Sequence, residues 1–171
     1  PDGSTHVVKT DTMVFPVKTL INEKWVCVGA QARAVDPAAS YSKYYAIFPF
    51  KGANYFFGEQ LLYLRQDLPI ILVEGALDAI HLGSDGFRSV ALMGTALQDT
   101  KIKKLLTANP KYVIILLDPD AAGTTAAKVI KNALLKHGLQ CLYRIPQKDP
   151  KYLQRQDLLN LLNERPENGI D

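Results

Sequence analysis

The pattern of apolar and polar residues changes character near residue 67. Before this point, apolar and aromatic residues occur in short runs separated by turn-forming residues, which is typical of antiparallel strands. We predict strands over residues 12–18, 25–34 and 42–48, a turn at 21–23, a loop at 36–40 and a short helix over 58–66. The first 66 residues therefore predict a small β-rich domain.

After residue 67, continuous apolar runs alternate with segments of helical spacing. The predicted strands cover residues 70–73, 89–93, 112–117 and 139–145, and the predicted helices cover 76–83, 98–107, 121–137 and 152–163. Strands that are apolar on both sides indicate a parallel sheet with helices on both faces. Gly138 suits the end of the third helix. The sequence therefore predicts an α/β domain over residues 67–171 behind the β-rich domain of residues 1–66.

Acidic residues follow two of the predicted parallel strands. Glu74 comes directly after the first of them, and Asp118 and Asp120 follow the third. The carboxyl ends of parallel strands form the functional edge of an open α/β sheet, and these two strands are expected to be neighbours or near neighbours. Converging carboxylates repel one another unless cations lie between them, and hard oxygen ligands favour Mg²⁺ or Mn²⁺. The sequence thus predicts a divalent-metal site.

Each acidic residue also has a simpler interpretation. A glutamate after a strand is often a solvated or helix-capping residue, and Asp78 suits the surface of a helix. The run Asp118-Pro119-Asp120 is compatible with a turn followed by a helix N-cap. Their common placement at one sheet edge favours the metal site. Gly75 and Gly123 agree with it, because glycine lets the backbone approach a metal or phosphate closely.

Composition narrows the protein class further. With 47% hydrophobic and 22% charged residues, the chain resembles ordinary globular proteins, and its net charge of +3 says little about nucleic acid. The apolar run over 113–117 is too short to cross a bilayer, so no membrane partner and a cytoplasmic location, in a bacterium or a phage-infected host, are expected. Cys27 and Cys141 are predicted to be reduced core thiols without zinc. The chain begins at Pro1 rather than at a methionine, as an excised fragment of a longer protein does.

Four motifs in a fixed order resemble the Toprim domain, and specifically that of DnaG-type primases. They are Val73-Glu74-Gly75-Ala76-Leu77-Asp78, then Gly94-Thr95-Ala96-Leu97, then Asp118-Pro119-Asp120-Ala121-Ala122-Gly123, and last Asp149-Pro150. The first half resembles the basic subdomain that precedes Toprim in primases. Its matching segments are 29–34, Ser42-Lys43-Tyr44, Lys51 and 55–58, and together with Phe15-Pro16-Val17 they are most similar to bacteriophage primases.

The resemblance implies a DNA primase core, a nucleotidyltransferase that makes short RNA primers on a single-stranded DNA template from nucleoside triphosphates. It implies catalytic roles for Glu74, Asp118 and Asp120, and two or more Mg²⁺ or Mn²⁺ ions whose ligands also include Asp78 and Asp149. Glu74 either completes the metal shell or acts as general base. The basic residues Arg33, Lys43 and Lys51 are expected to neutralise phosphates. Tyr44 or Phe57 is the candidate for stacking on bases, although aromatic residues at strand spacing more often belong to the core.

Two departures from the primase pattern are visible. Bacterial primases carry Asp-Pro-Asp where this chain has Asp149-Pro150-Lys151, so a cation replaces one outer carboxylate. The zinc-binding template-reading module is absent from the sequence. Either the chain is the catalytic fragment of a longer protein that carries a zinc-binding domain or a replicative helicase, or a partner recognises the template. The alternatives are a Toprim nuclease, which cuts nucleic acid without nucleotides, and a non-catalytic binding module. No tyrosine can be assigned as a topoisomerase nucleophile.

Overall fold

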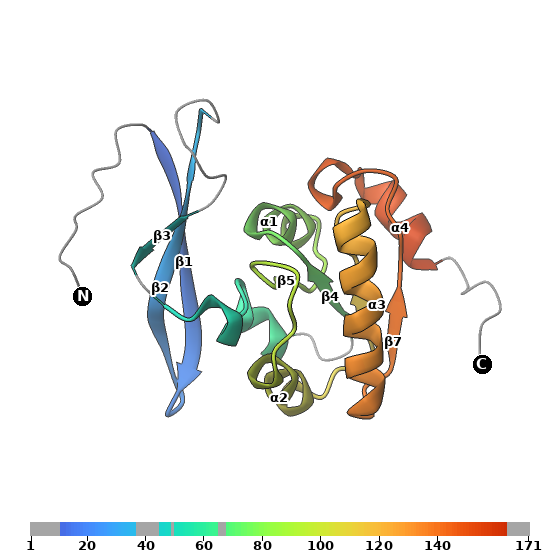
Figure 1. The fold of residues 1–171 in the computed structure, drawn as a ribbon, viewed down its shortest axis with the longest axis horizontal. Coiled ribbons are helices and arrows are strands. Elements are labelled where there is room, and N and C mark those ends of the chain that lie inside the picture. The colour runs from blue at the N-terminus through green and yellow to red at the C-terminus, as the bar shows by residue number, and fades with distance from the viewer. Residues whose placement is uncertain (1–10, 37–44, 49, 65–67, 164–171) are drawn as a thin grey trace.

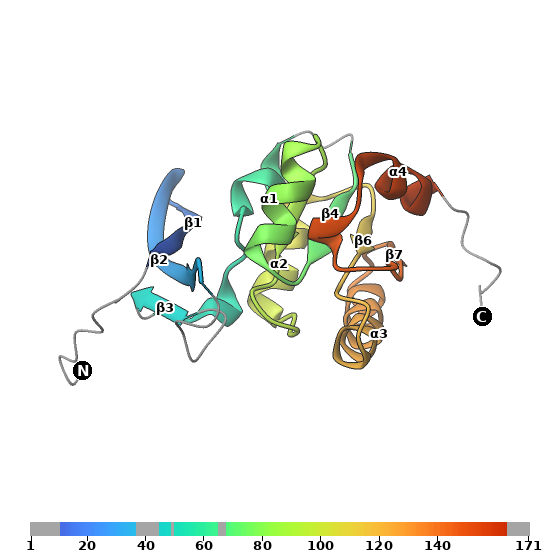
Figure 2. The ribbon, with the colours of Figure 1, turned by 90° about the horizontal axis from the view of Figure 1, so that it is seen from above.

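The computed structural model describes residues 11–36, 45–48, 50–64 and 68–163 of the 171-residue chain. Two separate sheets lie side by side, a three-stranded antiparallel sheet formed early in the chain and a four-stranded parallel sheet formed later (Figures 1 and 2). They are called the N-terminal sheet and the parallel sheet below. The α/β fold class that the sequence predicts is confirmed.

The N-terminal sheet consists of β1 (Thr12–Ile21), β2 (Lys24–Ala34) and β3 (Tyr45–Phe48), in that order. The predicted turn is a two-residue hairpin loop, in which Asn22 and Glu23 have φ angles of 46° and 62°. Such loops match the right-handed twist of the strands, and β1 therefore continues to Ile21 instead of ending at residue 18. Phe15, Val17 and Thr19 alternate inward along β1 and are buried.

A short connection joins the two sheets. It contains two 3-10 helices, η2 (Gly52–Asn54) and η3 (Glu59–Tyr63), the second replacing the helix predicted over 58–66. Gly58 enters η3 with a φ of 77°, a conformation that favours glycine. Phe57 pairs with Ala91 of the parallel sheet through two backbone hydrogen bonds of 3.0 Å. The connection is therefore hydrogen-bonded to the parallel sheet as well as packed against β1.

The parallel sheet has the strand order β5-β4-β6-β7, and all neighbouring pairs are parallel. Its strands are β4 (Ile70–Val73), β5 (Ser89–Ala91), β6 (Val113–Ile115) and β7 (Cys141–Tyr143). The helices are α1 (Ala76–Ser84), α2 (Asp99–Ala108), α3 (Ala121–Lys136) and α4 (Arg155–Asn163), with the 3-10 helix η4 (Pro150–Tyr152) before α4. The expectation that β4 and β6 are close along the sheet is confirmed, because they are direct neighbours.

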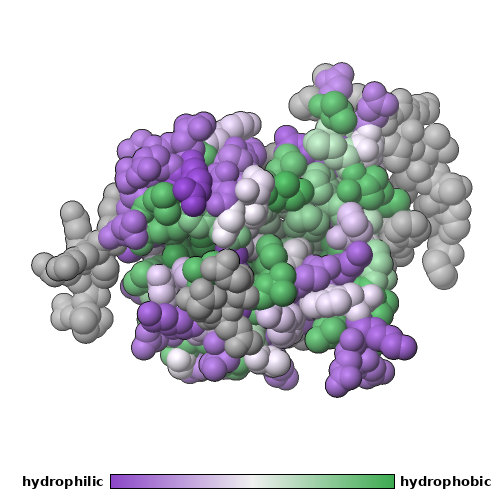
Figure 3. All heavy atoms as spheres, turned by 180° about the vertical axis from the view of Figure 1, so that it is seen from behind, coloured by the Kyte–Doolittle hydropathy of each residue, from purple (hydrophilic) through white to green (hydrophobic). Residues whose placement is uncertain are grey.

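Helices cover both faces of the parallel sheet, as predicted. Leu105 of α2 and Ile130 of α3 pack with Leu72 on one face. Leu82 of α1 and Leu158 of α4 pack with Ile71 on the other. Residues 113–117 are all buried, which explains their continuous apolar character. The surface, by contrast, intersperses hydrophilic and hydrophobic residues, as Figure 3 shows for the back of the molecule.

Some predicted boundaries and one burial prediction were wrong. The last predicted helix is divided, because Pro150 starts the single turn of η4 and α4 begins only at Arg155. Cys27 and Cys141 are free thiols, but Cys27 is exposed and does not belong to the core. The whole start of β2, from Lys24 to Cys27, is exposed, and the register between β1 and β2 shifts near this point. Strand-like composition alone could not show that this end of the hairpin lacks a covering layer.

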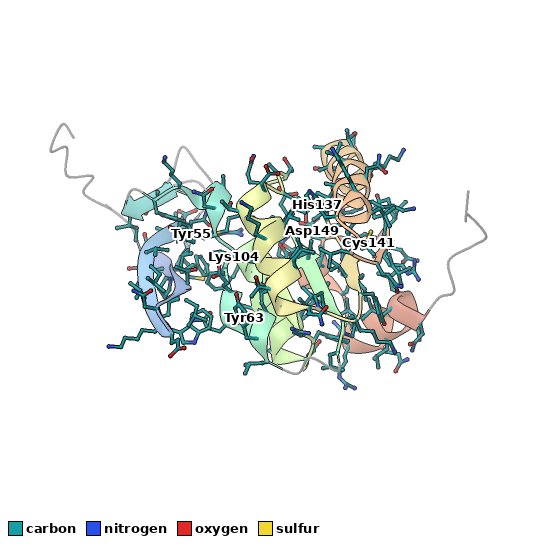
Figure 4. All side chains as sticks on the ribbon, turned by 90° about the horizontal axis from the view of Figure 1, so that it is seen from below. Tyr55, Tyr63, Lys104, His137, Cys141 and Asp149 are labelled. Atoms are coloured by element: carbon teal, nitrogen blue, oxygen red, sulfur yellow. The ribbon has the colours of Figure 1, made fainter. Side chains whose placement is uncertain are left out.

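A buried ionic contact ties the N-terminal sheet to α2. Glu59 of η3 is 1% exposed and accepts hydrogen bonds of 2.5 Å from both Thr19 of β1 and Lys104 of α2. We call these three residues the junction cluster. The ammonium group of Lys104 also lies 4.5 Å from the centre of the Tyr55 ring, and Figure 4 shows Lys104 and both Tyr55 and Tyr63 in this region. The cluster holds the N-terminal sheet against α2, because the buried carboxylate of Glu59 is stable only beside a cation such as Lys104.

Lys101, one turn before Lys104 on α2, is also buried at this junction. It is 1% exposed and donates a 2.5 Å hydrogen bond to the carbonyl oxygen of Leu92. Burial and repulsion by Lys104 lower the pKa of Lys101 to about 8, although Glu59 acts in the opposite direction. An ammonium group with a pKa this far below its ordinary value titrates within an accessible pH range.

The stability of the protein is therefore expected to rise with pH above about 8. Between pH 8 and 10.5, the unfolded Lys101 holds a proton that the folded Lys101 has lost, so raising the pH favours the folded state. From about pH 7.5 to 9.5, the free energy of unfolding of the wild type should increase by about 2 kcal/mol more than that of Lys101→Met. Urea denaturation at both pH values measures this difference. Parallel pH profiles for the two proteins would contradict the lowered pKa.

Candidate active site

The acidic residues singled out in the sequence follow the two central strands of the parallel sheet. Leu72 of β4 pairs in register with Ile115 of β6, so that both strands end at the same level. Glu74 leaves the end of β4, and Asp118 follows the extended backbone after β6. The parallel register therefore brings these two carboxylates to one edge of the sheet, as expected from strand order alone.

A pocket of about 200 Å³ lies at this edge. It is lined by residues from both sheets: Gln31, Arg33, Glu74, Gly75, Asp78, Met93, Gly94, Asp118 and Lys151. Gln31 and Arg33 come from β2 of the N-terminal sheet, whereas the others follow strands of the parallel sheet. The pocket thus has an acidic side and a side that contains an arginine. Such a cavity suits a phosphate-bearing ligand that carries divalent cations.

The loop that presents Asp118 is held against the start of α3. Asp120 is the N-cap of α3, and its side chain accepts a 2.6 Å hydrogen bond from the backbone N–H of Gly123. A Cβ atom at Gly123 would overlap the carbonyl oxygen of Asp118, so only glycine permits this close approach. The side chain of Asp120 is exposed and does not line the pocket, and its N-cap contact is the simpler role that the sequence left open.

Asp78 is buried, and this corrects the alternative of a surface helix residue. One oxygen of its carboxylate accepts a 3.2 Å hydrogen bond from the backbone N–H of Gly75, at the N-terminus of α1. The other accepts a 3.1 Å hydrogen bond from the backbone N–H of Lys151. Asp78 therefore connects α1 to η4 across the rim of the pocket.

Lys151 places an ammonium group among the predicted metal ligands. It forms an ion pair with Asp149, and its Nζ lies 3.7 Å from the Oδ1 atom of Asp78. Burial alone would lower the pKa of Lys151, but the hydrogen bond to Asp149 and the charges of Asp78, Asp149 and Asp118 raise it above its ordinary value. Lys151 is consequently a permanent cation at neutral pH. Figure 4 shows Asp149 within the half of the molecule that contains the parallel sheet.

The predicted basic residues occupy different places. Arg33 lines the pocket, but Lys51 is exposed just before η2 and is not among the pocket residues. Lys43 and Tyr44 lie outside the described residues. The structure adds Gln31, which the period-two spacing from Arg33 along a strand places on the same face. It also adds Met93, whose φ of 57° turns the chain at the pocket just after β5.

The sequence and the fold have known counterparts. A profile of the Toprim-like family matches residues 71–153. The DNA primase of Aquifex aeolicus is 36% identical over 123 residues, which cover 67% of this chain and 24% of that protein. A Myxococcus xanthus DNA primase is 37% identical over 76 residues, covering 44% of this chain and 12% of that protein. The chain thus spans about a quarter or less of the length of these relatives.

Solved structures extend the similarity to both sheets. The crystal structure of the zinc-binding and RNA polymerase domains of the Aquifex aeolicus primase has a TM-score of 0.72 and 31% identity. The match covers 88% of this chain and 39% of that one. This chain has the fold of a DnaG-type primase core. A DnaG primase catalytic domain bound to single-stranded DNA shares that fold, with a TM-score of 0.71, 22% identity, and coverage of 88% of this chain and 50% of that one.

The pocket offers a divalent ion a restricted set of ligands. Among the residues that the structure describes, no three acidic, histidine or cysteine side chains converge closely enough to hold a metal ion by themselves. Glu74 and Asp118 nevertheless share the pocket, and the Oδ1 atom of Asp118 is shielded from solvent there. Mg²⁺ is commonly held by one or two carboxylates together with substrate phosphates and water. The donor set at Glu74 and Asp118 therefore fits an ion of this kind.

Over the described parts of the chain, no helix has both the length and the apolar composition needed to cross a membrane.

Proposed function

We propose that the chain is the catalytic core of a DNA primase, which joins ribonucleotides into short primers on single-stranded DNA in the cytoplasm. One observation carries the proposal: Arg33 of the N-terminal sheet and the carboxylates of Glu74 and Asp118 line a single pocket. A template-directed polymerase must hold anionic nucleotides and metal ions in one place, and this pocket combines both requirements. The similarity to the Aquifex aeolicus primase over both sheets supports it.

The chain's own residues have separate roles in this proposal. Glu74 and Asp118 would hold Mg²⁺ or Mn²⁺, which when bound stabilises negative charge on the transferring phosphoryl group, and Asp120, two residues after Asp118, is proposed as a further ligand. Arg33 binds a phosphate of the nucleotide or the template from the opposite side of the pocket. The N-cap contact of Asp120 and the tight packing at Gly123 keep the Asp118 loop in place, so the carboxylates need not reorganise when substrate arrives.

Primer synthesis by the purified protein tests this function. The chain, alone and fused to the zinc-binding domain of the Aquifex aeolicus primase, is incubated with Mg²⁺ or Mn²⁺, single-stranded DNA of mixed sequence and labelled nucleoside triphosphates. Labelled oligonucleotides are expected, and Glu74→Ala should abolish them. A non-catalytic binding module would be unaffected by Glu74→Ala, whereas cleavage of the DNA without nucleotides would identify a Toprim nuclease. Absence of oligonucleotides from both forms would refute the proposal.

A further inference from the structure

The surroundings of Lys151 are those of a bound cation. Its side chain is 12% exposed, and it approaches the carboxylates of Asp149 and Asp78, whose side chains are 33% and 6% exposed. Its ammonium group also lies 4.8 Å from the centre of the Tyr152 ring. The position of the backbone is fixed independently, because the N–H of Lys151 donates to Asp78. The cation is therefore held in a defined place between two acidic side chains.

The formal charges around the pocket leave room for one divalent ion. Four carboxylates lie in the pocket or at its rim: Glu74, Asp78, Asp118 and Asp149, whereas the side chain of Asp120 is exposed outside it and is not counted. Two cationic side chains, Arg33 and Lys151, accompany them. Two uncompensated negative charges remain, which is the charge that one Mg²⁺ or Mn²⁺ balances. A second ion would leave the pocket with excess positive charge before any phosphate entered.

We propose that the ammonium group of Lys151 takes the place of a divalent ion beside Asp78 and Asp149, so that this chain binds one ion fewer than it would with a carboxylate at position 151. The inference rests on the proposed function, which places a divalent ion elsewhere in the same pocket. It departs from the expectation of two or more ions in the pocket.

The position of Lys151 explains why a metal ion does not enter beside it. An ion that contacted both Asp78 and Asp149 would lie next to a tethered ammonium group, and the two like charges would repel each other. The ammonium group is covalently attached through the Lys151 side chain, so its local concentration beside Asp78 and Asp149 is high. A competing metal ion must instead bind from solution. An aspartate at position 151 would remove both the repelling ammonium group and its attachment to the chain. Three carboxylates would then face one another and require a cation.

Counting bound Mn²⁺ ions tests the inference without any assay of activity. The protein is titrated with Mn²⁺, and the free ion is measured by its electron paramagnetic resonance signal. Lys151→Asp is expected to bind one more Mn²⁺ per chain than the wild type. The matched control is Lys148→Asp, which makes the same charge change at an exposed position three residues away that does not line the pocket. Lys151→Arg, which keeps the cation, should bind the wild-type number.

The outcomes separate this inference from the proposed function. Equal counts for Lys151→Asp and wild type overturn the inference, and so does an equal gain in Lys148→Asp, since charge alone would then explain it. If the wild type binds no Mn²⁺ and Lys151→Asp binds one ion, the inference is supported. The part of the proposed function that places an ion at Glu74 and Asp118 is then contradicted. Should Lys151→Asp fail to fold, Lys151→Met replaces it. Saturating Mn²⁺ should raise its melting temperature by several degrees more than that of the wild type, and equal shifts overturn the inference.

Discussion

Asp118→Asn is expected to lower the rate of primer synthesis by at least about 10³-fold, which corresponds to about 4 kcal/mol of transition-state stabilisation. Asparagine has nearly the same shape as aspartate and retains a carbonyl oxygen, so the loop between β6 and α3 should keep its structure. The substitution removes one negative charge from a group whose Oδ1 atom is shielded from solvent inside the pocket. A divalent ion then loses an anionic ligand at a site where few others are available.

The measurement is the initial rate of labelled dinucleotide formation at saturating nucleotide, together with the melting temperature of each protein. Asp99→Asn is the matched control, because it makes the same substitution at an exposed position in the first turn of α2. It should retain the wild-type rate. An Asp118→Asn protein that keeps more than about a tenth of the wild-type rate would show that Asp118 is not a ligand for an essential ion.

Gly123→Ala is expected to lower the free energy of unfolding by more than about 4 kcal/mol, a loss large for a single methyl group. The added Cβ would overlap the carbonyl oxygen of Asp118 and would lie 3.2 Å from its carbonyl carbon. Both are backbone atoms, so the clash cannot be relieved by rotating a side chain. Either α3 or the loop that presents Asp118 must therefore move. If Gly123→Ala still folds, it should also lose primer synthesis.

Gly83→Ala provides the contrast for this measurement. Gly83 lies within α1, and a Cβ atom there would meet only the Ser89 hydroxyl oxygen, at an ordinary 3.8 Å. Because alanine is a better helix former than glycine, this change should be neutral or stabilising by up to about 1 kcal/mol. Urea denaturation followed by circular dichroism compares both variants with the wild type. Similar stabilities for the two variants would be inconsistent with the close approach at Gly123.

The arrangement of the parallel sheet was predictable because each strand has a strong local signal. Strands such as β4 and β6 are buried on both faces, so their apolar runs are continuous, and the acidic residues that end them mark the functional edge. The N-terminal sheet gave a weaker signal. Its alternating pattern identified β1, but the exposure of Cys27 depends on what packs against the hairpin. That information lies in tertiary contacts and not in the strand itself.

The site was predictable only where sequence position determines spatial position. Glu74 and Asp118 follow adjacent parallel strands, so their proximity follows from topology. The contact between Asp78 and Lys151 joins residues 73 positions apart and depends on how η4 packs against α1. For Asp120 the position was predictable but the role was not. An aspartate at this place can act as an N-cap or as a metal ligand, and the sequence alone does not separate these roles.

The junction cluster has a consequence for how the chain folds during synthesis. Lys104 comes 45 residues after Glu59, so the ribosome completes the whole N-terminal sheet before it makes the cation that Glu59 requires. Until α2 emerges, Glu59 lacks the ammonium group of Lys104, although Phe57, which packs against Phe15 of β1, has already been made. The N-terminal sheet, although translated before the parallel sheet, therefore completes its ionic contact with α2 only after residue 104 has been made. Between these two sheets, order of synthesis and order of completed packing therefore differ.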